Sequence, residues 1–273
     1  MTVFMTMTEV IRSRRSVRTF SGEPLREQDK QKIMAFAETA ENPYHLPIVW
    51  RLLDKKETGL SSPVIVGEDA FLAGTMRREP HAEEAFGYSF ERIVLFAESL
   101  GIGTTWIAGT MDRSAFEKAV SLAEGDVMPC VSPLGYPAQK MSLRESVMRR
   151  GVRADSRLGF SELFFSGSFD QPLTPDEAGQ WQPALQAVRL APSAVNKQPW
   201  RAVVCGDRVH FYEKQSKARG SGEWDIQRVD LGIALCHFAL AAGECRLPVS
   251  FRLEDPGLPA PANTVYIATY AAE

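Results

Sequence analysis

The sequence predicts an α+β protein, an α/β sandwich made of two related halves. Amphipathic helical segments alternate with short extended segments, and the order of these segments repeats along the chain. A chain of 273 residues with 44% hydrophobic content can also bury one large core or two smaller ones. We therefore expect an N-terminal half over residues 1–140 and a C-terminal half over residues 141–273.

Composition and charge exclude several classes of function. The net charge of -3 gives no electrostatic reason to expect a nucleic acid or an anionic membrane as partner. No run approaches the ~20 apolar residues that span a bilayer, and the N-terminal segment lacks the pattern of a secretory signal. The four cysteines form no CxxC pair and are typical of reduced thiols, so we expect a cytoplasmic protein that acts on a small molecule.

The N-terminal half begins with helical periodicity and continues into mixed elements. We expect helices over residues 7–15, 26–40, 83–100 and 112–123, and strands over residues 48–54, 104–109 and 128–137. A short extended stretch is expected at 64–67. Asp112 is placed to cap the last of these helices.

The C-terminal half follows the same order after a charged connector at residues 138–158. We expect helices over residues 175–191 and 228–243, and strands over residues 200–206, 210–214, 249–253 and 264–270. In both halves a helix runs into a proline-containing break and then a strand.

Short sequence matches support an internal duplication. Phe-Ser-Gly at 20–22 recurs at 165–167, each followed by Pro-Leu, and the break after each helix aligns Tyr44 with Asn196. Because α/β proteins often repeat such a rhythm without common descent, the shared order of elements carries more weight than any one match.

The first chemical motif is RRSVR at residues 14–18. Three guanidinium groups and a hydroxyl lie within five residues, and arginine binds phosphate bidentately with a charge that does not titrate away. When these residues are taken alone, a solvated basic helix end is the favoured interpretation.

The second motif is APSAVNKQPW at residues 191–200. Two prolines bracket small and amide residues between a helix and a strand, and such a rigid loop can aim amides at the edge of a heterocycle. The alternative is a proline-stiffened surface loop with an Asx-type turn.

The third motif is LGIGTTWIAG at residues 100–109. Its glycines permit a tight turn and close approach of the backbone to a ring. The GxG here is not a dinucleotide fingerprint, because no third glycine follows and the segment ends a helix instead of opening one. A helix C-cap followed by a core strand is the plainer interpretation.

Together these motifs, with LGYP at 134–137, resemble the flavin-dependent nitroreductase family, and most closely a tandem subgroup that carries both halves of the usual homodimer in one chain. The resemblance covers nearly the full length. It implies a nitroreductase-like fold that forms an intramolecular pseudo-dimer, with mostly antiparallel central sheets flanked by helices. It also implies FMN as cofactor, NAD(P)H as reductant, and ping-pong hydride transfer through flavin N5 to a nitroaromatic, quinone or similar acceptor.

The resemblance also assigns residues to the cofactor. Arg14, Arg15, Ser16 and Arg18 would hold the phosphate and ribityl chain, Pro192, Ser193, Asn196 and Gln198 would line the isoalloxazine, and Ile107, Ala108 and Gly109 would cover the edge near N5. A basic residue after LGYP would complete the phosphate site, with Arg144 the first choice and Arg149 the second. The chain has Ala108 where the family often has an acidic residue.

Comparison of the halves predicts one FMN per chain, because the first half has Tyr44 in place of Asn196 and the second has GFSEL in place of RRSVR. A monomer would then supply the interface that relatives gain by dimerising, although a homodimer stays possible. The alternatives are a non-catalytic flavin-binding protein on a degenerated scaffold, or another flavin reaction. No catalytic residue of fixed identity and no metal site is expected. His237 fits a core or interface residue, and Glu83, Glu84 and Glu91 fit a solvated helix face.

Overall fold

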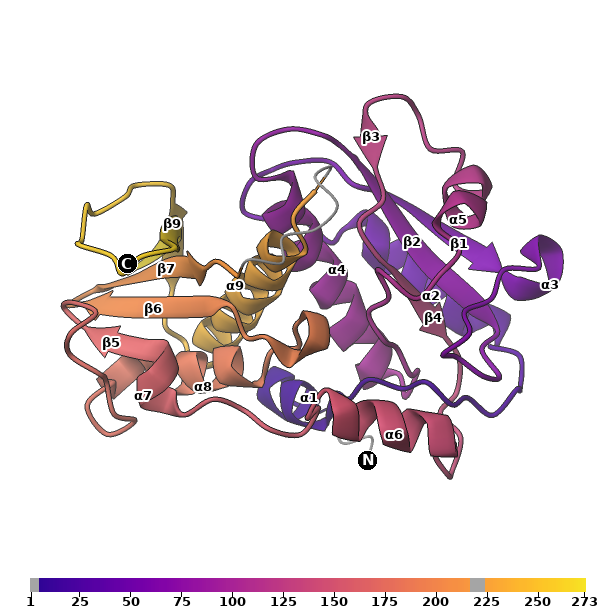
Figure 1. Cartoon of the computed structure of the whole chain (residues 1–273), viewed down its shortest axis with the longest axis horizontal. Coiled ribbons are helices and arrows are strands. Elements are labelled where there is room, and N and C mark those ends of the chain that lie inside the picture. The colour runs from indigo at the N-terminus through magenta and orange to yellow at the C-terminus, as the bar shows by residue number, and fades with distance from the viewer. Residues whose placement is uncertain (1–4, 217–223) are drawn as a thin grey trace. The chain divides into compact units, whose positions relative to one another are not determined.

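The computed structural model describes residues 5–216 and 224–273. The chain divides into two compact units: the first unit is Ser13–Ala154, and the second unit comprises residues 5–12 and the described part of Asp155–Glu273 (Figure 1). This division differs from the expected boundary at 140/141, because the helix α6 (Leu143–Gly151) belongs to the first unit. Thr19 Oγ1 donates to Glu145 at 2.7 Å and lies 3.0 Å from Ser142 Oγ. The expected connector is thus partly helical.

The first unit contains a four-stranded sheet with β2 at its centre. Strand β2 pairs antiparallel with β1 on one side, and with β4 and β3 in succession on the other. Its elements in order are α2 (Glu27–Glu38), β1 (Val49–Asp54), α3 (Lys55–Thr58), β2 (Ala70–Arg77), α4 (Ala82–Ser99), α5 (Arg113–Ala119), β3 (Asp126–Val127), β4 (Val131–Leu134) and α6.

Strand β2 is absent from the predicted elements, because it is buried on both faces and shows no alternation of polar and apolar residues. Helix α4 covers one face, where Phe86 packs against Trp50 at 5.8 Å between ring centroids. Gly74 is required there, since a Cβ would lie 2.4 Å from the Trp50 ring. The expected strand at 104–109 is also wrong: this segment makes only isolated bridges, such as Ile107 to Val131.

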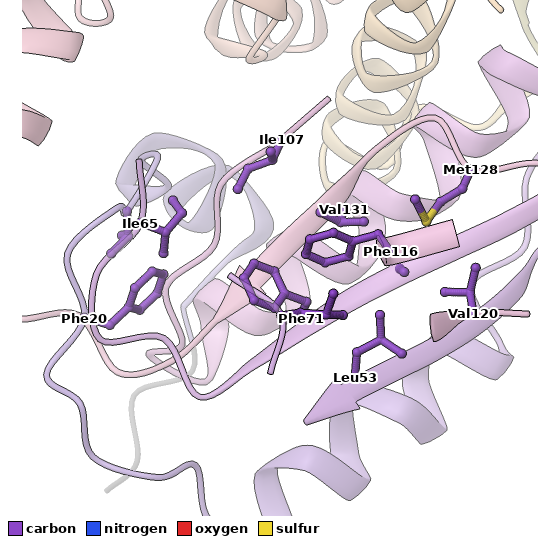
Figure 2. Close-up of a cluster of buried hydrophobic side chains, with 12 residues drawn as sticks. Phe20, Leu53, Ile65, Phe71, Ile107, Phe116, Val120, Met128 and Val131 are labelled. Atoms are coloured by element: carbon purple, nitrogen blue, oxygen red, sulfur yellow. The ribbon is translucent and has the colours of Figure 1, made fainter. Parts of the chain in front are cut away.

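Helix α5 covers the other face of this sheet and closes a hydrophobic cluster. Figure 2 shows the side chains of this cluster, among them Phe116 of α5 and Phe71 of β2. Phe116 of α5 meets Phe71 of β2 edge-on at 5.0 Å. Asp112 caps α5 as expected, accepting the backbone N–H of Ala115 at 3.2 Å. The side chain of Ile107 belongs to the same cluster, which ties the third motif to the core.

The second unit contains a five-stranded sheet in the order β5-β6-β7-β9-β8, antiparallel except for the β5–β6 pair. Its elements are α1 (Met7–Ser13, of which Ser13 groups with the first unit), α7 (Phe160–Leu163), β5 (Phe164–Ser166), η1 (Gly179–Trp181), α8 (Gln182–Leu190), η2 (Ala194–Asn196), β6 (Trp200–Cys205), β7 (Arg208–Lys214), α9 (Ile226–Glu244), β8 (Val249–Arg252) and β9 (Thr264–Ala272).

Helix α9 is the core helix of the second unit. By length and composition it is the one described helix that could cross a membrane, but 72% of its apolar window is buried inside the protein. Phe238 packs between Phe211 at 5.2 Å and Tyr270 at 5.0 Å, and His237 Nδ1 lies 3.0 Å from the Ala187 carbonyl oxygen. The prediction that His237 is a core residue is confirmed, since its exposure is 0%.

When α3, α5 and η2 are set aside, both units share one order of elements: α2-β1-β2-α4-β3-β4 in the first unit and α8-β6-β7-α9-β8-β9 in the second. In each, the first two strands pair with one another and the second strand pairs with the last. The fold is therefore α+β, with two mostly antiparallel sheets flanked by helices in two related halves. Gly22 and Gly167, which end the matched Phe-Ser-Gly segments, both have left-handed backbone, at φ 81° and 70°.

Candidate functional site

The arginine-rich segment at residues 14–18 is extended. The expected helix over residues 7–15 included Arg14 and Arg15, but α1 ends at Ser13. Two backbone hydrogen bonds hold the arginine-rich segment on either side: Val17 N–H donates to the Thr104 carbonyl at 2.8 Å, and Val66 N–H donates to the Arg18 carbonyl at 3.0 Å. The side chains therefore separate, with Arg14 buried and Arg15 exposed.

The first and third motifs lie side by side in the first unit. Ser16 and Thr104 form a parallel bridge, and a Cβ on Gly103 would lie 2.9 Å from the Val17 side chain. Gly101 of the GxG has left-handed backbone at φ 74° and open space around it, whereas Gly103 serves the close approach of two backbone segments. This is a structural reason for the glycine that the sequence alone did not reveal.

Three guanidinium groups and one carboxylate form what we call the arginine cluster: Arg14, Arg18, Arg149 and Glu145. Burial lowers the pKa of Arg18, the carboxylate of Glu145 raises it, and the charges of Arg149 and Arg14 lower it further. Nη1 of Arg14 and Nη1 of Arg18 are buried and make no hydrogen bond within the described residues. Two buried cationic donors without acceptors form an environment that suits an anion.

Arg144 and Arg149, the two candidates for the basic residue that completes the phosphate site, have different environments. Arg149 Nη1 lies 3.5 Å from the Ser16 carbonyl oxygen, beside the arginine cluster. Arg144 is exposed and donates to the Pro63 carbonyl instead. The geometry of the first unit therefore favours Arg149, the second choice from the sequence.

Residues 107–109 have three different environments. The backbone of Ile107 exchanges two 2.9 Å hydrogen bonds with Val131 while its side chain lies in the core (Figure 2). The Ala108 carbonyl accepts from Arg113 Nη2 at 3.0 Å. Gly109 is exposed, and no atom lies within 4 Å of the position of an added Cβ. Of the three, Gly109 has the open surroundings that a ligand edge requires.

The loop at 192–198 lies in the second unit and is held by its own polar groups. Gln198 is buried; its Oε1 accepts the Leu158 N–H at 3.0 Å and its Nε2 lies 3.3 Å from Asn196 Oδ1. The Asn196 amide donates to the Ser156 carbonyl at 3.1 Å, and Ser193 Oγ accepts the Gln198 N–H at 2.9 Å. These amides fix the loop, so Gln198 is a structural member of it.

Strained backbone marks this loop as an unusual segment. Val195, Asn196 and Gln198 have φ of 45°, 57° and 50°, in the left-handed region that costs non-glycine residues energy. Asp230 of α9, which the sequence did not single out, accepts the Ala194 N–H with both carboxylate oxygens at 3.0 and 3.1 Å. Burial raises the pKa of Asp230 well above its ordinary value, the Ala194 N–H opposes this, and the charges of Asp225 and Glu213 add to it.

The expected solvated face of the 83–100 helix is wrong for two of its three glutamates. Glu84 and Glu91 are buried, with exposures of 1% and 0%. Both lie opposite the apolar face that carries Phe86, which is why their residue type predicted solvent. The small residue Gly87 on the same side as the two glutamates was the available signal that this side is covered as well.

Comparisons with known proteins agree with this fold. A family described as "Putative TM nitroreductase" matches residues 6–242. A solved structure of a putative nitroreductase from Thermotoga maritima shares 20% identity with a TM-score of 0.64, covering 98% of this chain and 94% of that one. An FMN-dependent nitroreductase from Clostridium difficile shares 15% identity with a TM-score of 0.42, covering 52% of this chain and 94% of that one. No curated protein matches the chain.

Proposed function

The chain belongs to the putative TM nitroreductase family, and on that premise we propose that it is an FMN-dependent NAD(P)H oxidoreductase of nitroreductase type. The observation that carries the proposal is the arginine cluster of the first unit, where two buried guanidinium nitrogens have no acceptor among the described residues. A phosphate monoester supplies the oxygens and the negative charge that these donors lack.

The residues of the first unit fit the phosphate end of FMN. Arg14, Arg18 and Arg149 would bind the phosphate, and the half-buried hydroxyl of Ser16 lies in the same segment. Arg15 is exposed and would add long-range attraction for an anion. Arg144, which bonds the Pro63 carbonyl, is not part of this proposal.

The residues assigned to the isoalloxazine stay a prediction. Gly109 has open space around it, and the loop with Pro192, Ser193, Asn196 and Gln198 is rigidly held in its own unit. Rigid, strained loops of this kind cluster at ligand sites. Gln198 would act by fixing the loop, since its side chain is already engaged with Leu158 and Asn196.

FMN, when bound, would accept a hydride from NAD(P)H and pass reducing equivalents to a nitroaromatic, quinone or similar acceptor in a ping-pong cycle. The protein's own residues would bind and orient the cofactor. No side chain is required as an acid, base or nucleophile in this scheme, so the proposal rests on binding geometry.

A non-catalytic flavin-binding protein is the second candidate. The observation that favours it is the replacement of the second polar set: in the first half Tyr44 stacks on His81 at 5.2 Å, where the second half has Asn196. With this replacement, one of the two sites expected from the duplication has lost its polar residues. A scaffold that diverges in this way could also have lost turnover at the site that keeps them.

A binding and reduction assay separates the two. We expect purified protein to bind FMN and turn yellow, to lose this colour with NADH or NADPH, and to recover it with a nitroaromatic or quinone. Binding without bleaching favours the flavin-binding protein, and no binding refutes both. Arg14→Ala combined with Arg18→Ala should weaken FMN binding by at least about 10-fold, as expected for lost charge-assisted bonds, while Arg12→Ala on α1 is the basic control.

A further inference from the structure

Glu91 of α4 links two motifs through its two carboxylate oxygens. Trp106 Nε1 donates to Oε2 at 3.0 Å, and Arg14 Nε lies 3.9 Å from Oε1. The side chains of Glu91 and Arg14 are 0% and 5% exposed. Trp106 is itself held against α4 by Phe90, at 4.7 Å between ring centroids.

This arrangement has an energetic reason. A buried carboxylate is costly unless it is paired and hydrogen-bonded, and Arg14 cannot lower that cost by losing its proton. The indole N–H fixes the orientation of the carboxylate, which in turn provides the negative charge that faces Arg14. Without Glu91, the nearby positive charge of Arg18 would repel the Arg14 guanidinium towards solvent.

We propose that Glu91 is a positioning residue that holds Arg14 in the arginine cluster, ready to bind the phosphate of FMN; this inference rests on the proposed function. The 3.9 Å ion pair engages only the Nε side of the guanidinium, and Nη1 stays buried without a hydrogen-bond acceptor in the described part of the chain. Glu91 therefore orients the group without consuming its remaining donors.

If Glu91 only offset the charge of Arg14, its removal would strengthen phosphate binding. Loss of one negative charge makes the arginine cluster more positive, which would tighten phosphate binding if Arg14 kept its place. The positioning role predicts weaker binding, because the guanidinium leaves the cluster. The sign of the change thus decides between a carboxylate that positions Arg14 and one that only offsets its charge.

The test compares FMN with riboflavin, which has the same ring and ribityl chain but no phosphate. For Glu91→Gln we expect about 10-fold weaker FMN binding, the size of one charge-assisted bond, and unchanged riboflavin affinity. Glu84→Gln is the matched control, because Glu84 is a buried glutamate on the same helix that faces His81, at 3.8 Å from its Nδ1, instead of Arg14. Equal losses for both flavins, or tighter FMN binding, would overturn the proposal.

A double-mutant cycle tests whether Glu91 acts through Arg14. In an Arg14→Met background, Glu91→Gln should cause no further loss of FMN affinity, and Trp106→Phe should cause a smaller loss of the same kind in the wild-type background. If the wild type binds no FMN, the proposed function fails. The flavin-free protein then still tests the pair, since additive shifts in thermal midpoint for Glu91→Gln and Arg14→Met would refute it.

Discussion

Asp230 lies beneath the strained loop of the second unit, with both carboxylate oxygens within 3.1 Å of the Ala194 backbone nitrogen. Asp230 is 2% exposed, so this N–H has a buried acceptor just ahead of three residues with left-handed backbone. The contact fixes the point at which the loop turns away from α9.

Replacing Asp230 with alanine should release this loop. Loss of the acceptor leaves a part-buried N–H unsatisfied, which costs about 1 kcal/mol of unfolding free energy. Asp230→Asn keeps an oxygen acceptor and should cost less. Urea denaturation measures the unfolding free energy of both variants. Equal losses would show that the hydrogen bond to the Ala194 N–H is not what Asp230 contributes to stability.

The raised pKa of Asp230 also predicts a pH dependence of stability. The folded protein holds this proton more tightly than the unfolded chain, so the stability it contributes is present below the ordinary value of 3.8. That stability is lost as the pH rises from there towards the raised folded value. We expect the free energy of unfolding of the wild type to fall from pH 4 upward through this range. Asp230→Asn has no proton to lose there, so its free energy of unfolding should lack this fall. Urea denaturation of both proteins at several pH values checks this.

Glu244 caps α1 within the second unit. Its carboxylate accepts the backbone N–H groups of Met7 at 2.6 Å and Thr8 at 2.9 Å. Burial raises the pKa of Glu244, but the hydrogen bonds from Thr8 and Met7 outweigh it and lower the pKa below its ordinary 4.5. The stabilisation is present above that value and lost as the pH falls through the lowered one. Glu244→Gln should cost about 1 kcal/mol and speed hydrogen exchange of α1; unchanged exchange would contradict the contact.

Gly74 in β2 should not tolerate a side chain. A Cβ there would lie 2.4 Å from the Trp50 ring and 2.9 Å from Phe86, so Gly74→Ala should cost about 1–3 kcal/mol through overpacking. Gly243→Ala at the end of α9 is the control, because its added Cβ meets nothing within 4 Å. Thermal unfolding compares the two variants. Similar midpoints would contradict the prediction and mean that Trp50 and Phe86 shift to make room for the added Cβ.

Arg149 should matter more than Arg144 for FMN. Arg149→Ala removes a cation beside Ser16, whereas Arg144→Ala removes a bond to the Pro63 carbonyl. We expect at least about 10-fold weaker FMN binding for the first and near wild-type affinity for the second. Titration at two salt concentrations checks this, since loss of a phosphate contact also reduces the salt dependence.

The sequence predicted the long helices α2, α4, α8 and α9 and the strands β1, β6, β7, β8 and β9 well, because period and caps are local signals. It missed helix α6 and the edge strand β5. The α5 cap at Asp112 and the core position of His237 followed from residue type alone. Strand β2 was not predicted, because burial on both faces removes the alternation of polar and apolar residues. The extended state of residues 14–18 depends on hydrogen bonds to Thr104 and Val66, which are distant in sequence.

Within the candidate site, the motifs point to segments of the chain, and the structure shows which polar atoms of those segments are already hydrogen-bonded. Arg14 and Arg18 keep buried donors without hydrogen-bond acceptors in the described chain, as a phosphate site requires. Gln198 is engaged within its own loop, and Arg144 points to a backbone carbonyl. The supporting acids, Glu91 and Asp230, carry no local signature, because their roles depend on which side of a helix the tertiary structure covers.

The grouping of residues 5–12 with the second unit has a consequence for synthesis on the ribosome. Helix α1 is translated before the first unit, yet the carboxylate that caps it belongs to Glu244, which follows the first unit in the chain. The first unit can complete its sheet during translation, whereas the second unit cannot close around its own N-terminal helix until α9 has emerged. A fragment starting at Asp155 would lack that helix, and adding a peptide of residues 5–13 in trans should restore part of the lost stability.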